Sequence, residues 1–312
     1  MKHIIYKSEK EKNGTTNIAE CALGCKQHST NKHIWLCYAK NMGELAKEEA
    51  KHHDEDDEDP VTVHQLNAWR NTYYHQHITN TLMNIAKGSH LLEIGAGSGN
   101  DAKPLFPEYY LTLTDVSSKT LNRTYHRLQQ SGAPIEDIQF IACDGEHLPF
   151  ADNQFGGVFM VATFHHFEHP ERGINEVHRV LTSGGTVILG VEPNKTYFKL
   201  IHIFQHILFK LTHTDTEHIS KADAEMEGFS YKELTKLIDT KNWQEIDIKP
   251  MWFLTGFLHY KSEFLYRAFK LKKRITIPPS IEKIVVALDE FLFKLPGIKH
   301  LCWHWIIFAK KK

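Results

Sequence analysis

The stretch His90–Asp101, HLLEIGAGSGND, decides how this chain folds. A short apolar run ends at Ile94, and from there glycine alternates with other residues. This pattern is typical of a buried parallel strand that turns sharply into a helix. Glycine lets the backbone approach a ligand closely, because it has no Cβ. The stretch therefore predicts an α/β fold with a ligand at the strand end, beside Gly95, Gly97 and Gly99.

The spacing of these glycines argues against a dinucleotide. The dinucleotide-binding fingerprint has its third glycine one residue later, where this chain has Asn100. Pro104 and Pro107 shorten the helix that follows, whereas a pyrophosphate is best bound by the N-terminus of a long helix. Glu93 places a carboxylate just before the turn, which suits a ligand with cationic groups. We therefore expect a cofactor that has a sugar but no phosphate.

Two further predicted strands end in a carboxylate. The strand over residues 109–115 ends at Asp115, which can accept both hydroxyls of a ribose. Nicotinamide and methionine cofactors share this contact, so it does not choose between them. The strand over residues 138–143 ends at Asp144-Gly145, where a carboxylate and a backbone N–H can read an adenine. An Asp-Gly pair that only forms a turn is the local alternative.

Two histidines and a glutamate follow the fourth and fifth predicted strands. His165 and His166 come after the strand over residues 155–162, and Glu192 comes after the strand over residues 186–191. Ligands collect at the carboxyl ends of parallel strands, and an imidazole there can serve as a general base near neutral pH. The alternative is that both histidines only pack against or cap the next helix.

The chain resembles the class I S-adenosylmethionine-dependent methyltransferases of type 11. Their motif I, E/D-x-G-x-G-x-G, matches residues 93–99, and DGEHLPF over residues 144–150 and RVLTSGG over residues 179–185 are similar to later family phrases. The resemblance implies S-adenosylmethionine as cofactor and His166 as the preferred base, with Glu192 to orient it. It also implies a set of cofactor-binding residues: Glu93, Gly95, Ala96, Gly97, Gly99, Asp115, Val116, Asp144, Gly145 and Val161.

The resemblance spans residues 61–312 and is strongest up to Asn194. It implies a Rossmann-like, seven-stranded, mostly parallel sheet with helices on both faces and an antiparallel last strand. The implied activity is methyl transfer to a small-molecule or lipid-like acceptor, at oxygen. Two alternatives stay open at this point, a nicotinamide-dependent oxidoreductase and a cofactor-binding scaffold without activity.

Residues 1–60 are expected to form an N-terminal extension. The acidic block over residues 54–59 repels itself and ends at Pro60, which predicts a linker and a domain boundary. Cys21, Cys25 and Cys37, with two histidines among them, match no strong zinc spacing. We therefore expect no metal site, and cysteines that are buried or idle.

An insertion within the methyltransferase-like region is expected over residues 195–228. Its apolar segment, residues 197–211, predicts a lid over an apolar acceptor pocket or a peripheral contact with a membrane. From Lys195 onward the chain has 20 Lys and Arg against 13 Asp and Glu, which permits contact with an anionic surface, although a solvated basic face is the plainer interpretation.

Composition argues against some functional classes and bears on the location of the protein. The net charge of −1 argues against a nucleic-acid specialist, and no run of 18 apolar residues occurs. Without a recognisable signal sequence, and with five widely spaced cysteines, a cytoplasmic location is expected. The sequence leaves the oligomeric state open.

Overall fold

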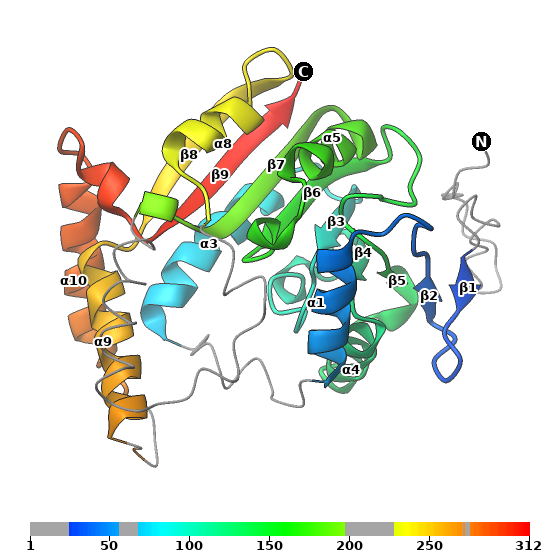
Figure 1. Ribbon diagram of the computed structural model, residues 1–312, viewed down its shortest axis with the longest axis horizontal. Helices are drawn as coiled ribbons and strands as arrows, with labels where there is room; N and C mark the ends of the chain where they lie inside the picture. Colours follow the sequence, from blue (N-terminus) through cyan, green and yellow to red (C-terminus); the bar gives the residue numbers. More distant parts are fainter. Residues whose placement is uncertain (1–24, 56–67, 197–227, 270, 272–274) are drawn as a thin grey trace.

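The computed structural model describes residues 25–55, 68–196, 228–269, 271 and 275–312. These residues form one nine-stranded sheet in the order β1-β2-β5-β4-β3-β6-β7-β9-β8, with helices packed on both faces (Figure 1). The strands are β1 (Lys26–Gln27), β2 (Ile34–Leu36), β3 (His90–Ile94), β4 (Tyr110–Asp115), β5 (Ile138–Ala142), β6 (Phe155–Val161), β7 (Leu181–Pro193), β8 (Trp243–Met251) and β9 (His304–Lys311).

The helices of the described ranges cover the sheet and its carboxyl edge. They are α1 (Glu44–Glu55), α3 (Trp69–Met83), α4 (Ser118–Gln130), α5 (Pro170–Val180), α8 (Tyr231–Leu237), α9 (Leu254–Ala268) and α10 (Pro279–Leu292), with short 3-10 turns such as Phe164–His166. The strands predicted over residues 109–115, 138–143, 155–162 and 186–191 correspond to β4, β5, β6 and β7, although β7 begins earlier, at Leu181. No helix was expected at α1 or α9.

The sheet is mostly parallel, as expected. Strands β2 to β7 pair in parallel, whereas β9 runs antiparallel between β7 and β8. The expected count of seven strands is too low, because β1 and β2 extend the sheet beyond β5. Both strands come from the N-terminal region that the sequence analysis left without structure.

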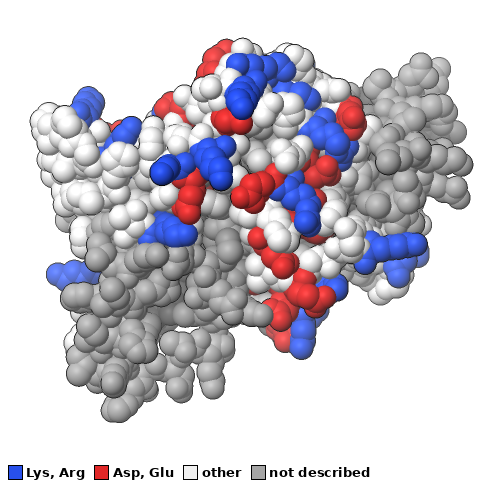
Figure 2. Space-filling view, turned by 45° about the horizontal axis from the view of Figure 1, so that its top comes forward, with Lys and Arg blue, Asp and Glu red and all other residues white. Residues whose placement is uncertain are grey.

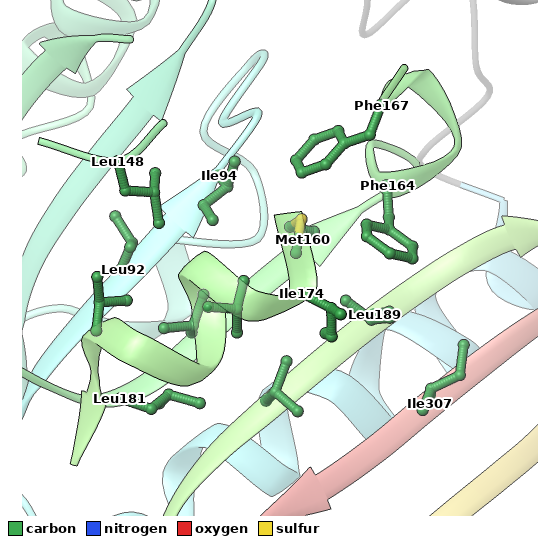
Figure 3. Close-up of a cluster of buried hydrophobic side chains, with 14 of the residues drawn as sticks. Leu92, Ile94, Leu148, Met160, Phe164, Phe167, Ile174, Leu181, Leu189 and Ile307 are labelled. Atoms are coloured by element: carbon green, nitrogen blue, oxygen red, sulfur yellow. The ribbon is translucent and has the colours of Figure 1, made fainter. Parts of the chain in front are cut away.

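Burial on both faces explains the apolar strands. Leu91 and Leu92 of β3 point to opposite faces of the sheet, and both are fully buried. One core cluster lies between the sheet and α5, where Phe164, Phe167 and Ile174 meet the strands (Figure 3). The second cluster lies on the other face, with α3 and α4. The glycine turn after β3 is thus held between two packed layers.

The N-terminal region joins this sheet. Strand β2 pairs with β5, and Cys25 forms a disulfide with the buried Cys37, so these two cysteines are not idle. Cys21 lies outside the described residues. Helix α1 extends to Glu55, so the acidic block begins inside a helix and not in a linker. The domain boundary predicted at this block stays a prediction.

The remaining expectations concern the apolar lid segment, membrane spans and metal sites. The apolar segment over residues 197–211, predicted as a lid or membrane contact, lies outside the described residues. Within the described ranges, no helix is both long and apolar enough to span a bilayer. No group of three or more possible metal ligands occurs among the same residues.

Candidate functional site

Five parallel strands bring the predicted site residues to one edge of the sheet. Strands β5, β4, β3, β6 and β7 are neighbours in this order, so their carboxyl ends lie side by side. Ligands of open α/β sheets bind at such an edge, where the chain leaves β3 and β6 in opposite directions across the sheet. The residues that follow these strands are therefore candidates for one shared site.

The turn after β3 leaves room for a ligand at Gly97. Gly95 has φ of 71°, and a Cβ added there would lie 2.3 Å from Thr163 Cγ2, so no larger residue fits. Gly97 has φ of 47°, and the nearest atom to an added Cβ would be Gly95 O at 4.0 Å. Among the residues that the structure describes, no atom comes closer, which leaves space for a ligand over Gly97. The backbone N–H of Ala96 donates to Thr114 O at 2.8 Å, and Gly99 N donates to Ala96 O at 2.7 Å.

Glu93 gives this site an unbalanced buried carboxylate. The side chain is 3% exposed, and Oε2 has no hydrogen-bond partner among the residues that the structure describes. Burial, followed by the nearby carboxylates of Asp101 and Asp115, raises the pKa of Glu93 well above its ordinary value. Leaving such a group unpaired is costly, and a cationic ligand would relieve this cost. The observation fits a ligand with an amino and a sulfonium group.

Asp115 is held in place by two backbone donors. Its carboxylate accepts from Gly97 N at 3.1 Å and from Ser117 N at 2.9 Å, which links the glycine turn to the end of β4. Burial raises the pKa of Asp115, although these two N–H groups act in the opposite direction. At the next position, Val116 O accepts from Tyr38 OH at 2.9 Å. The carboxylate is therefore oriented before any ligand arrives.

Asp144 and Gly145 form a packed turn. The Asp144 carboxylate accepts from Glu146 N at 2.9 Å and lies 2.8 Å from His147 Nδ1. A Cβ added to Gly145 would lie 2.4 Å from Phe167 Cζ, so the glycine is required by packing. The local alternative of an Asp-Gly turn thus describes the observed contacts. Their predicted role near an adenine stays a prediction.

The catalytic candidates pair differently from the prediction. Glu192, fully buried at the end of β7, contacts His165 and not His166, since His165 Nδ1 lies 2.9 Å from Glu192 Oε2. The same carboxylate accepts from the backbone N–H groups of Thr163, Phe164 and His165. His166 Nδ1 instead lies 3.2 Å from Glu49 Oε2 of α1. The two imidazole rings nevertheless lie side by side, with their centroids 4.2 Å apart.

Val161 completes the predicted set; its side chain packs against the second core cluster, and its backbone contacts the site. It ends β6, and its carbonyl accepts from Thr163 Oγ1 at 3.0 Å. Through Thr163, which also donates to Gly95 O at 3.4 Å, the end of β6 is tied to the glycine turn.

A third histidine near this edge was missed by the sequence analysis. His304 begins β9 and pairs in register with Pro193, next to Glu192. Burial, followed by the imidazoles of His259 and His165, lowers the pKa of His304 to about 3, so it is neutral near physiological pH. The ring of Trp252 lies 5.2 Å from that of His304. Trp252 Nε1 is buried without a hydrogen-bond partner among the described residues. No local pattern marks these two residues.

Helix α1 lies over the same edge, beside α4 (Figure 1). Its Glu49 is buried next to His166, and its Asp54 accepts from Ser117 Oγ at 2.6 Å. Arg123 of α4 donates to His53 O at 2.9 Å. The sequence did carry one usable signal for α1, because residues 44–51 are almost all strong helix formers.

Comparisons with known proteins identify the family of this chain. A family model for the methyltransferase domain of type 11 matches residues 92–189. The chain is 31% identical over 188 residues to the ubiquinone/menaquinone biosynthesis C-methyltransferase UbiE of Neisseria meningitidis, which covers 58% of this chain and 72% of that protein. The corresponding protein of Coxiella burnetii is 27% identical over 135 residues, or 42% of this chain and 54% of that protein.

The fold is also similar to a solved structure. Phosphoethanolamine N-methyltransferase 2 of Haemonchus contortus aligns over 76% of this chain and 52% of its own, with a TM-score of 0.51 and 18% identity. The nicotinamide-dependent alternative finds no support, because Asn100 breaks its fingerprint and the matched family transfers methyl groups. The chain is an enzyme that belongs to the class I S-adenosylmethionine-dependent methyltransferases of type 11, with S-adenosylmethionine as its cofactor.

Proposed function

We propose that this methyltransferase acts on a small-molecule or lipid-like acceptor with an ionisable hydroxyl group, and that it methylates this acceptor at oxygen. The observation that carries the proposal is the buried pair of His165 and Glu192, 2.9 Å apart at the ends of β6 and β7. A base at this place is useful only if the acceptor loses a proton during the reaction.

The chemistry of four groups along the edge supports cofactor binding there. Glu93 is suited to the cationic methionine portion, the backbone at Gly97 to close approach, and Asp115 to the ribose hydroxyls. Asp144 and Gly145 follow on the next strand, toward the adenine. When bound, S-adenosylmethionine supplies an electrophilic methyl group, so the protein mainly has to position the donor and acceptor and to manage the proton.

We propose that His165, in preference to His166, is the base that accepts the hydroxyl proton of the acceptor. A carboxylate only accepts hydrogen bonds, so Glu192 favours the tautomer of His165 that carries its hydrogen on Nδ1. Nε2 is then the basic nitrogen, and Glu192 stabilises the imidazolium that forms when it takes the hydroxyl proton. His304 stays neutral beside it and adds no repelling charge. The buried Trp252 Nε1 is suited to an oxygen of the acceptor.

Methylation at carbon is a second candidate, because the relative in Neisseria meningitidis is named a C-methyltransferase. The same base serves both outcomes. A hydroxyl on a conjugated ring that loses its proton shares the negative charge with ring carbons, and either atom can then receive the methyl group. Carbon methylation finally releases a proton from the ring, whereas oxygen methylation ends with the loss of the hydroxyl proton.

The test is a screen for labelled-methyl transfer over small aromatic, sugar and lipid extracts. ¹³C NMR of the product separates a methoxy carbon from a methyl group on carbon. His165→Ala should lower kcat by about 10² to 10⁴-fold, the usual contribution of a positioned base, and leave the affinity for S-adenosylhomocysteine nearly unchanged. Glu192→Gln should shift the pH profile of kcat.

His166→Ala is the matched comparison, since it removes the neighbouring imidazole. A larger loss of kcat in His166→Ala than in His165→Ala would return the role of base to His166. Full activity of both variants on the same acceptor would mean that transfer proceeds without a protein base.

A further inference from the structure

The outer side of α10, together with the turn that follows it, carries a regular apolar stripe. Its residues follow one another at intervals of three, four, three and four, which places them on one side of a helix. Five large apolar side chains in this stripe are 44% to 63% exposed: Ile281, Ile284, Leu288, Phe291 and Leu295. A contiguous apolar surface of this kind marks an interaction site.

The acidic groups of α10 point away from the stripe. Glu282, 2% exposed, forms an ion pair with Arg70 of α3. Asp289, fully buried, accepts from the backbone N–H groups at the start of α9. Glu290 is half-buried and accepts from Tyr74 OH at 3.1 Å. All the acidic side chains of α10 are thus engaged with the protein interior or its margin.

The basic groups remain on the outside. Lys283 and Lys294 are exposed and line a groove of about 310 Å³ between α10 and α3, together with the rings of Trp69 and Tyr73 and the half-buried Glu290. Lys283 Nζ lies 5.6 Å from the centre of the Trp69 ring. In Figure 2 the left edge, where Figure 1 places α10, shows mostly white atoms with isolated blue groups. The surface is apolar with a cationic margin.

We propose that α10 is a membrane-docking element that lies in the plane of an anionic lipid surface. The stripe would enter the boundary between headgroups and acyl chains, and Lys283 and Lys294 would meet lipid phosphates. Charge complementarity favours this occupant over a second copy of the chain. In a symmetric dimer through α10, Lys283 and Lys294 of both copies would approach one another with only Glu290 of each copy beside them, a carboxylate that already accepts from Tyr74.

This inference does not rest on the identity of the methyl acceptor, and its test is independent of methyl transfer. The full-length chain is mixed with vesicles of phosphatidylcholine and phosphatidylserine in equal parts, or of phosphatidylcholine alone, and sedimented. The chain should bind the mixed vesicles in preference to the neutral ones, and less so as salt is raised. Lys283→Glu/Lys294→Glu and Ile284→Ser/Leu288→Ser/Phe291→Ser should each weaken binding about tenfold or more.

The controls carry changes of the same kinds at other exposed positions. Lys232→Glu/Lys236→Glu alters two lysines of α8, and Met83→Ser alters an apolar residue that is 45% exposed at the end of α3. Both controls should bind like the unaltered chain, and all variants should keep the thermal unfolding midpoint because the positions are exposed. Equal sedimentation of the α10 variants and the unaltered chain overturns the proposal. So does a dimer, seen by light scattering, that the triple variant dissociates.

Discussion

At the scale of single residues, the site depends on buried carboxylates that have distinct partners. The backbone N–H groups of Gly97 and Ser117 orient Asp115, and those of the turn that contains His165 orient Glu192. Oε2 of Glu93 accepts from no donor among the described residues. A satisfied carboxylate is preorganised, whereas an unsatisfied one favours a ligand that neutralises it. Asp115 and Glu192 therefore shape the site, whereas the buried carboxyl group of Glu93 favours binding of a cationic ligand.

Asp115→Ala tests the cofactor end of the site. The change removes the carboxylate that we expect to accept hydrogen bonds from the ribose hydroxyls. The binding free energy of S-adenosylhomocysteine should therefore weaken by about 1 to 3 kcal/mol in titration calorimetry. The change also removes an acceptor from Gly97 N and Ser117 N, so unfolding must be measured in parallel. Asp137→Ala, at an exposed position, is the control. Unchanged affinity in Asp115→Ala would exclude Asp115 from the cofactor site.

At the scale of elements, two helices begin with a capping serine in different surroundings. Ser230 and Glu233 form a reciprocal capping box at α8. Ser117 accepts from Thr120 N at 2.9 Å at the start of α4 and also donates to Asp54 of α1. One serine therefore stabilises a single helix, whereas the other joins two helices at the carboxyl edge of the sheet.

The two serines give a matched pair of variants. Ser230→Ala should lower the free energy of unfolding by about 1 kcal/mol, the usual loss for an N-cap. Ser117→Ala should cost more, because it strands a buried N–H and releases the end of α1. Amide hydrogen exchange in α1 should rise only in Ser117→Ala. If exchange in α1 stays the same, α1 is held by its other contacts, such as that of Glu49 with His166.

At the scale of the whole molecule, a buried ion pair fastens α10 to α3. Arg70 and Glu282 are 212 residues apart in sequence, and Glu282 also accepts from Arg70 N at 3.0 Å. Their exposures of 1% and 2% mean that neither charge can be solvated if its partner is removed. The pair thereby connects the helix before the glycine turn with the helix that carries the apolar stripe.

Arg70→Met should lower the free energy of unfolding by about 3 to 5 kcal/mol, because it leaves the carboxylate of Glu282 buried without its ion-pair partner. Arg70→Met/Glu282→Leu should lose less than the sum of the two single changes. Denaturant unfolding of the four proteins measures this coupling. Additive losses would show that the pair contributes no net coupling to stability.

The sequence by itself determined the central unit of this protein, residues 90–193. The strands from β3 to β7, the glycine turn and the cap of α4 at Ser117 follow from local rules. Apolar runs make buried strands, glycine permits positive φ at Gly95 and Gly97, and carboxylates after neighbouring parallel strands meet at one edge. These rules act over a few residues, so one sequence is sufficient to apply them.

Only the tertiary structure decided which side chains meet at that edge. The partner of Glu192 is His165, 27 residues away. The adjacent His166 lies beside Glu49 of α1 instead, although the two imidazole rings are only 4.2 Å apart. His304 and Glu49 reach the site from β9 and α1, through strand pairing and helix packing that no local pattern encodes. Such contacts depend on the path of the whole chain, since packing selects them among many residues of similar type.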